Sequence, residues 1–266
     1  MAAANPSFPR IARFKTAAAL RAHLATLAAP LPVDDEPLAA AEGSPLAAAL
    51  EIGGRQVGNR WCIHPMEGWD ATAAGTPSET LLRRWRRFGE SGAKLIWGGE
   101  AVAVVAEGRA NPNQLLAAAC GREGFARLLE TVRQAHRRSF DTADDLLVAL
   151  QLTHSGRFSR PTAAGRQPRI AYHHPLLDAR HGVAADDNGC VVSDSEVEQL
   201  IEHYVAAARD AEAAGFGMVD IKACHGYLLH EFLSARRRPG RFGGSFAGRT
   251  RLLRTIIERI RAACPG

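Results

Sequence analysis

The stretch GFGMVDIKACHGYLLHEFLSARRRPGRFGGSFAGR, residues 215–249, decides the fold class and the expected chemistry of this chain. It opens with an apolar run, residues 216–223, which is typical of a strand buried on both faces of a parallel sheet. Lys222, His225 and Tyr227 follow within six positions, where the strand should end. These side chains donate or exchange protons, and α/β proteins place their chemistry at the carboxyl ends of parallel strands. We therefore expect an α/β fold with a functional site at these three residues.

Three more strand–helix pairs precede this stretch. Apolar strands are predicted at residues 61–65, 93–99 and 146–152, each followed by apolar positions at helical spacing. Ser78 is the predicted N-cap of the first helix, and Ser193 with Glu196 forms a capping-box signature before the third. A last helix follows Arg249. Strand–helix alternation predicts a parallel sheet covered by helices, and four such units are half of an eight-unit (β/α)8 barrel.

Two parts of different character are expected along the chain. Residues 1–45 are Ala-rich with no acidic residue before Asp34, and we expect an N-terminal extension there, distinct from the α/β part at residues 46–266. The extension is expected to be a docking segment beneath the barrel or a loosely ordered tail, with an organelle transit peptide as the alternative. Residues 50–57 alternate around Gly53 and Gly54, which predicts a small hairpin.

Composition excludes several classes of function. Hydrophobic residues make up 46% and charged residues 23% of the chain, as in globular proteins, and no apolar run is long enough to span a membrane. Five cysteines without C-x-x-C spacing argue against a disulfide framework or a metal site, and favour a reducing, cytoplasmic location. The net charge of +5 comes from arginine clusters without aromatic interleaving, so no nucleic-acid partner is expected.

Four strand ends carry motifs that belong together. These are HPM at residues 64–66, GEAVAV at 99–104, QLTHSGR at 151–157 and KACHGYLL at 222–229, with FGGS following at 242–245. The set resembles the old yellow enzyme family of NADH:flavin oxidoreductases, which are FMN-dependent ene-reductases, over the N-terminal half of that family's TIM barrel. The resemblance implies FMN as cofactor, NADH or NADPH as reductant, a small α,β-unsaturated carbonyl or related substrate, and possible homo-oligomers.

The resemblance assigns five residues to the flavin. Pro65, Met66 and Glu67 would contact it after the first strand, largely through backbone groups. Ala101 would let the ring lie against backbone after the second strand. Gln151 would hydrogen-bond the pyrimidine edge, whose donors and acceptors match an amide.

Three residues are assigned to the substrate. Lys222 and His225 would bind the carbonyl oxygen, where negative charge develops when hydride reaches the alkene. Tyr227 would protonate the neighbouring carbon.

Two positions depart from the family pattern. Lys222 stands where the family has His, and Glu67 stands where it has a small hydroxyl or thiol residue. A carboxylate near the ring would disfavour the electron-rich reduced flavin.

Alternatives remain open at this point. A lysine at a barrel strand end is also what a Schiff-base aldolase needs, so Lys222 supports that hypothesis as well. The chain could instead be a non-catalytic half-barrel, or a truncated fragment whose flavin-phosphate site and remaining strands would follow residue 266.

Two further segments carry clusters of polar or charged residues. Residues 154–192 form a long polar segment, which predicts a functional loop; Arg169, His173 and His174 within it could belong to a substrate lid. The arginines of residues 236–249 are expected to be positioning groups or solvated charges.

Overall fold

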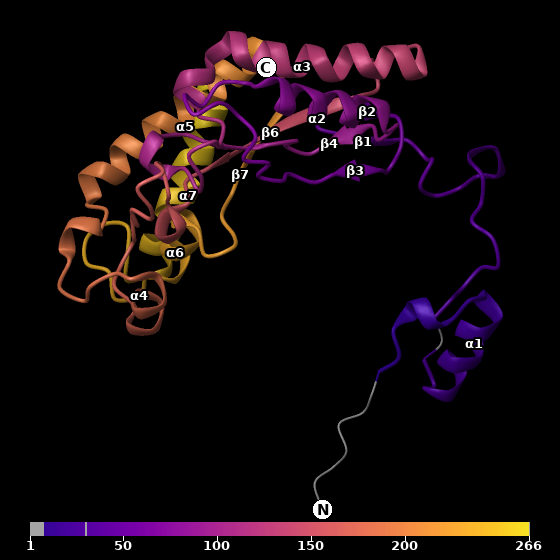
Figure 1. The fold of residues 1–266 in the computed structure, drawn as a ribbon, viewed down its shortest axis with the longest axis horizontal. Coiled ribbons are helices and arrows are strands. Elements are labelled where there is room, and N and C mark those ends of the chain that lie inside the picture. Colours follow the sequence, from indigo (N-terminus) through magenta and orange to yellow (C-terminus); the bar gives the residue numbers. More distant parts are fainter. Residues whose placement is uncertain (1–7, 30, 266) are drawn as a thin grey trace, which may run out of the picture. The chain divides into compact units, whose positions relative to one another are not determined.

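The computed structural model describes residues 8–29 and 31–265 and divides the chain into two compact units, Met1–Ala48 and Ala49–Gly266 (Figure 1). Within the first unit, α1 (Ala17–Thr26) begins at Thr16, whose hydroxyl accepts a hydrogen bond from the Ala19 N–H. The 3-10 turns η1 (Ile11–Arg13) and η2 (Ala40–Glu42) flank it. No residue of α1 is buried. All site residues predicted from the sequence lie in the second unit.

A small hairpin opens the second unit. β1 (Leu50–Ile52) pairs antiparallel with β2 (Arg55–Val57), and the two glycines between them have positive φ, 56° at Gly53 and 77° at Gly54. The predicted hairpin is confirmed.

Five parallel strand segments form the main sheet: β3 (Cys62–Ile63), β4 (Leu95–Ile96), β5 (Ala101–Ala103), β6 (Leu147–Thr153) and β7 (Met218–Ile221). β6 is central, with β4 and β5 following one another along one side and β7 along the other. Among the strands of the described residues, β3 pairs only with β4, so β3 and β7 are the outer strands. Their open edges explain why β7, predicted to be buried on both faces, is only half-buried, as is β3.

The second strand is interrupted, which the sequence did not predict. Ile96 is paired with Val148 and Ala101 with Gln151, so four residues of this strand oppose two residues of β6. Extra residues on one side of a ladder form a bulge and re-aim the strand. Gly98 permits it, because φ is 79° there and a Cβ would lie 2.9 Å from the Cβ of Gln151. The expected single strand at 93–99 is therefore wrong, since β5 lies in the expected loop.

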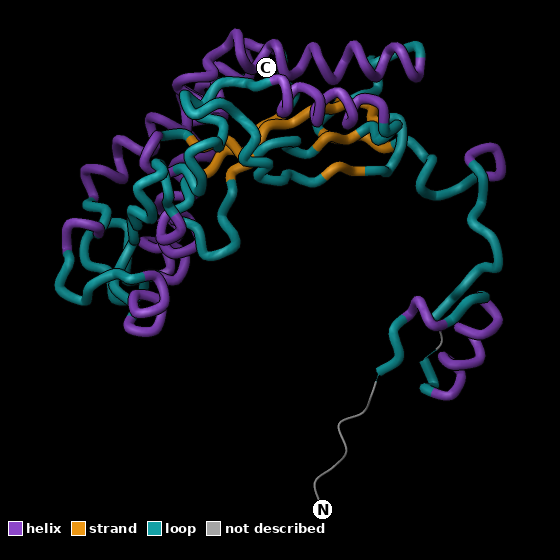
Figure 2. The backbone as a smooth tube through the Cα atoms, viewed as in Figure 1, coloured by secondary structure: helices purple, strands orange, loops and turns teal. Residues whose placement is uncertain are grey.

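Four long helices alternate with the strands. α2 (Glu79–Glu90) is capped by Ser78, α3 (Ala117–Phe140) has a break at Gly121, α5 (Asp194–Ala214) begins with the predicted capping box, and α7 (Phe246–Ala263) ends the chain. α2 packs on α3, α3 on α5, and α5 on α7 (Figures 1 and 2). This order of four βα units confirms the prediction of a partial TIM barrel. No helix in residues 8–29 and 31–265 is long and apolar enough to cross a membrane.

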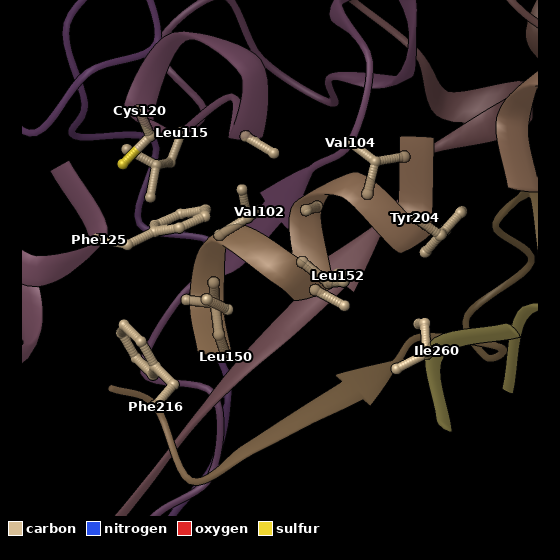
Figure 3. Packing of buried hydrophobic residues seen from close by; sticks show 14 of the residues in the cluster. Val102, Val104, Leu115, Cys120, Phe125, Leu150, Leu152, Tyr204, Phe216 and Ile260 are labelled. Atoms are coloured by element: carbon tan, nitrogen blue, oxygen red, sulfur yellow. The ribbon is translucent and has the colours of Figure 1, made fainter. Parts of the chain in front are cut away.

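The main core lies between the sheet and these helices (Figure 3). The ring of Phe216, just before β7, meets the rings of Trp85 on α2 and Phe125 on α3 edge-on, with centroids 6.2 Å away in both cases. Leu150 of β6 is fully buried in the same cluster. Aromatic side chains from α2 and α3 therefore fix the start of β7, and with it the position of the residues that follow.

Short helices occupy the loops after the strands. η3 (Ala106–Gly108) follows β5, and α6 (Leu228–Ser234) follows β7. Residues 154–192, predicted to be a loop, contain η4 (Gly156–Phe158), α4 (Pro175–His181) and η5 (Asn188–Cys190).

Candidate active site

Glu67 joins the ends of the two outer strands. Its Oε1 accepts a hydrogen bond from Lys222 Nζ at 2.9 Å, and its Oε2 accepts one from the Tyr227 hydroxyl, also at 2.9 Å. In a flat sheet, β3 and β7 would lie about 14 Å apart, three strand spacings. The segment after β3 instead crosses the curved end of the sheet to reach the residues after β7. The side chains of Lys222 and Glu67 are only 8% and 9% exposed, so water screens this ion pair weakly.

Lys222 and Tyr227 also meet directly. The Lys222 ammonium lies 4.1 Å from the centroid of the Tyr227 ring, within the range of a cation–π interaction. Burial, and then the neighbouring Glu67 charge, raise the pKa of Tyr227 above its usual value. The phenol therefore keeps its proton at neutral pH. The two departures from the family pattern, Glu67 and Lys222, compensate each other's charge.

His225 lies apart from this cluster. It is exposed, adopts a left-handed backbone with φ of 59°, and has no hydrogen bond with any residue in the described part of the chain. The positive φ of a non-glycine residue marks a turn, here between β7 and α6. The predicted pairing of His225 with Lys222 stays a prediction.

The flavin-assigned residues surround the same end of the sheet. Gln151 lies near the end of β6, paired with Ala101 of β5, and its Nε2 donates to Asp220 Oδ2 on β7 at 2.6 Å. The side chain of Pro65 lies beside the bulge, where a Cβ on Gly98 would come within 3.2 Å of it. Met66 is 71% exposed. The structure thus brings Ala101, Gln151 and Pro65 together and leaves the Met66 side chain in solvent.

A partly buried ionic cluster holds the segment that carries Glu67. Arg84 of α2 donates to Asp70 at 2.7 and 2.9 Å, to Glu100 in the bulge, and to the Gly99 carbonyl at 3.0 Å. Glu100 also accepts a hydrogen bond from the Gly68 N–H. Burial raises the pKa of Glu100 to about 7 against the opposing effect of Arg84. Sequence reasoning missed Arg84, Asp70 and Glu100, because nothing local shows that helix, bulge and loop meet.

A second ionic cluster, fully buried, fixes α6 behind Tyr227. Arg157, which ends the QLTHSGR motif, donates to Glu231 Oε1 of α6 at 2.6 Å and to Asp178 of α4. Glu231 Oε2 accepts from the Ala171 N–H at 2.9 Å. All three charged side chains are buried, and they hold the loop of residues 154–192 against α6. Arg157 is therefore a positioning residue for the element that begins at Tyr227.

Comparisons with known proteins agree on one family. The family model of the NADH:flavin oxidoreductase / NADH oxidase family matches residues 45–265. An NADPH dehydrogenase of Clostridium acetobutylicum is 30% identical over 215 residues, 78% of this chain and 57% of the relative. One of Halalkalibacterium halodurans is 31% identical over 183 residues, 68% of this chain and 48% of the relative. The chain spans about half the length of these curated relatives.

Solved structures show the same fold. The old yellow enzyme of a Pichia species superposes with a TM-score of 0.69 at 23% identity, covering 83% of this chain and 57% of that one. The old yellow enzyme homologue of Zymomonas mobilis superposes with a TM-score of 0.65 at 26% identity, covering 82% and 60%.

The parallel strands, with polar groups at their carboxyl ends, define the class of protein. It is a partial TIM barrel with its site at the strand ends, where enzymes of this fold have theirs. The chain belongs to the NADH:flavin oxidoreductase / NADH oxidase family, the FMN-dependent oxidoreductases of the old yellow enzyme type.

Family membership implies FMN, with NADH or NADPH as reductant, and the donor set at the strand ends fits a flavin ring. Gln151 Oε1 has no hydrogen-bond partner among the described residues, so it can accept from the pyrimidine N–H of the ring. Ala101, paired with Gln151 across the sheet, carries only a methyl group, so a ring beside Gln151 meets little side chain there.

Proposed function

We propose that residues 49–266 provide the substrate-facing half of an FMN-dependent reductase of activated alkenes, with Tyr227 as proton donor. The observation that supports this most directly is the hydrogen bond of Tyr227 to Glu67, which also binds Lys222. A proton donor, a cation and a carboxylate thus share one site at the strand ends.

Lys222 is the proposed ligand of the substrate's carbonyl oxygen. Its ammonium has three N–H donors, of which one goes to Glu67 and one side faces the Tyr227 ring. A donor remains for an oxygen that gains negative charge in the transition state. His225, exposed on the adjacent turn, is the proposed second donor.

Tyr227 is the proposed acid. Bound FMN would supply the hydride, and the carbon beside the carbonyl then needs a proton. Because the raised pKa keeps Tyr227 protonated, the phenol can provide that proton and Glu67 can orient the hydroxyl. Gln151 and Ala101 would hold the ring.

The experiment that tests this role compares two tyrosines. Tyr227→Phe should slow the reduction of an enone by about 100-fold or more, the range of general acid catalysis, while NAD(P)H oxidation with oxygen continues. Tyr204→Phe is the control, since Tyr204 is fully buried and its hydroxyl has no hydrogen-bond partner among the described residues. Equal enone rates in Tyr227→Phe and the native protein would remove Tyr227 from the mechanism.

Retention of FMN distinguishes the proposal from a non-catalytic half-barrel. The purified 266-residue chain should keep visible flavin bands through gel filtration after FMN is added. A protein that stays colourless favours the non-catalytic alternative.

The Schiff-base aldolase hypothesis has less support. A nucleophilic amine needs its lone pair, whereas Lys222 forms an ion pair with Glu67. Borohydride reduction in the presence of small carbonyl compounds should leave Lys222 unmodified.

A further inference from the structure

A cavity of about 1040 Å³ lies away from the strand-end site, between residues 171–175, the start of α5 and residues 234–240. Its volume is slightly above the usual range of small-molecule sites, about 300–1,000 Å³. Arg236, Arg237 and Arg238 line one wall, and His173 and His174 line another.

The charges on these walls do not balance. Asp194 is the one acidic residue among those that line the cavity, and Arg238 binds it with Nη2 to Oδ1 at 2.9 Å. Arg241, the next arginine of the segment, pairs with Glu198. Arg236 and Arg237 have no ion pair and no side-chain hydrogen bond with any residue in the described ranges. Two exposed arginines therefore line the cavity without a counter-charge among the described residues.

A smaller cavity of about 170 Å³ adjoins the first. Tyr172 and Ser234 line both cavities, and their hydroxyls are hydrogen-bonded at 2.9 Å. Its other walls include Phe158 and His181, whose ring centroids lie 4.7 Å apart. Flat aromatic walls suit a planar ring, because stacking on an aromatic face is favourable for any nucleobase.

We propose that the two cavities together bind a nucleoside diphosphate. Arg236 and Arg237 bind the two phosphates, since a guanidinium matches the geometry of phosphate oxygens with two parallel N–H donors. The base enters the aromatic cavity lined by Phe158, Tyr172 and His181. Neither Lys222 nor Tyr227 lines the two cavities, although the ring of Phe158 lies beside that of Tyr227, with centroids 5.7 Å apart.

Calorimetric titration of the 266-residue chain with ADP, and separately with inorganic pyrophosphate, tests the phosphate part. Arg236→Ala/Arg237→Ala should weaken both ligands by about tenfold or more, the usual effect of losing charged hydrogen bonds. Arg86→Ala/Arg87→Ala is the matched control, because it removes the same two charges from an exposed face of α2. The control should bind both ligands as the native chain does. Absence of saturable binding would overturn the proposal. Equal weakening in the two double variants would also overturn it, because it would show that net charge alone attracts the anion.

The ratio of the two affinities tests the base part. The affinity for ADP should be at least about tenfold higher than the affinity for pyrophosphate, because a base stacks on the aromatic walls. Equal affinities would overturn the nucleoside assignment and leave a site for free diphosphate. Neither titration requires flavin or turnover, so a failure of the reductase proposal would be seen separately.

Discussion

Glu67 accepts hydrogen bonds from the two groups that follow the last strand, and both Glu67 and Lys222 are largely withdrawn from water. Glu67→Gln should lower the free energy of unfolding by about 3 kcal/mol, because it leaves a buried ammonium without its carboxylate. Adding Lys222→Met should recover part of this loss, since the pair is then replaced by neutral groups. Urea unfolding of both single variants and the double variant measures the coupling. Strictly additive losses would contradict a direct Glu67–Lys222 interaction.

Glu100 gives the protein a pH-dependent stability. Its pKa rises from 4.5 to about 7 on folding, mainly through burial, so the folded state binds this proton more tightly than the unfolded chain. The free energy of unfolding should therefore fall as the pH rises from about 4.5 to about 7. Glu100→Gln should reduce that slope, as seen in urea midpoints measured across this interval. Glu258→Gln, at an exposed position, is the control and should follow the native curve. If the Glu100→Gln curve instead runs parallel to the native one, the pH dependence of stability comes from other groups.

At the scale of elements, the bulge between β4 and β5 depends on a glycine. Gly98 and Gly54 have nearly equal φ, 79° and 77°, but only a Cβ at Gly98 would meet neighbours, the Cβ and backbone N of Gln151 at 2.9 and 3.0 Å. Gly54→Ala should cost about 1–2 kcal/mol from the left-handed backbone alone. Gly98→Ala should cost about 1–3 kcal/mol more through overpacking, and should displace Gln151. Chemical unfolding of both variants provides the comparison, and equal losses would contradict the crowding at Gly98.

Elements governed by neighbouring residues were predictable. Ser78 and the Ser193–Glu196 box start helices through bonds within a single turn, and Gly53 and Gly54 close their hairpin locally. The interruption at Gly98 depends on pairing with β6, about fifty residues further along the chain. For that reason the second strand was wrongly expected to be continuous.

At the scale of the molecule, the contacts of the site also depend on residues that are distant in sequence, so local patterns do not predict them. The motifs brought Lys222, His225 and Tyr227 to one strand end, but Lys222 and Glu67 are 155 residues apart in sequence. Their partnership follows from the curvature of the whole sheet, which no local pattern reports. Two separate departures from a family motif thus became one ion pair only in the structure.

The division of the chain into Met1–Ala48 and Ala49–Gly266 makes a prediction for the whole molecule. A chain that begins at Ala49 should unfold at the same urea concentration as the full chain, because the second unit is compact by itself. Far-ultraviolet circular dichroism during the titration measures this. A clearly lower midpoint would show that the first unit supports the second.

The bridge from Glu67 to Lys222 and Tyr227 also constrains how this protein can be engineered. The same three side chains carry the proposed chemistry and keep the margins of the sheet together. Libraries that randomise them for a new substrate will mix changes in selectivity with loss of folded protein. His225 lies outside the bridge, on an exposed turn without described partners. We therefore expect substitutions of His225 to reduce the yield of folded protein less than substitutions of the three residues of the bridge.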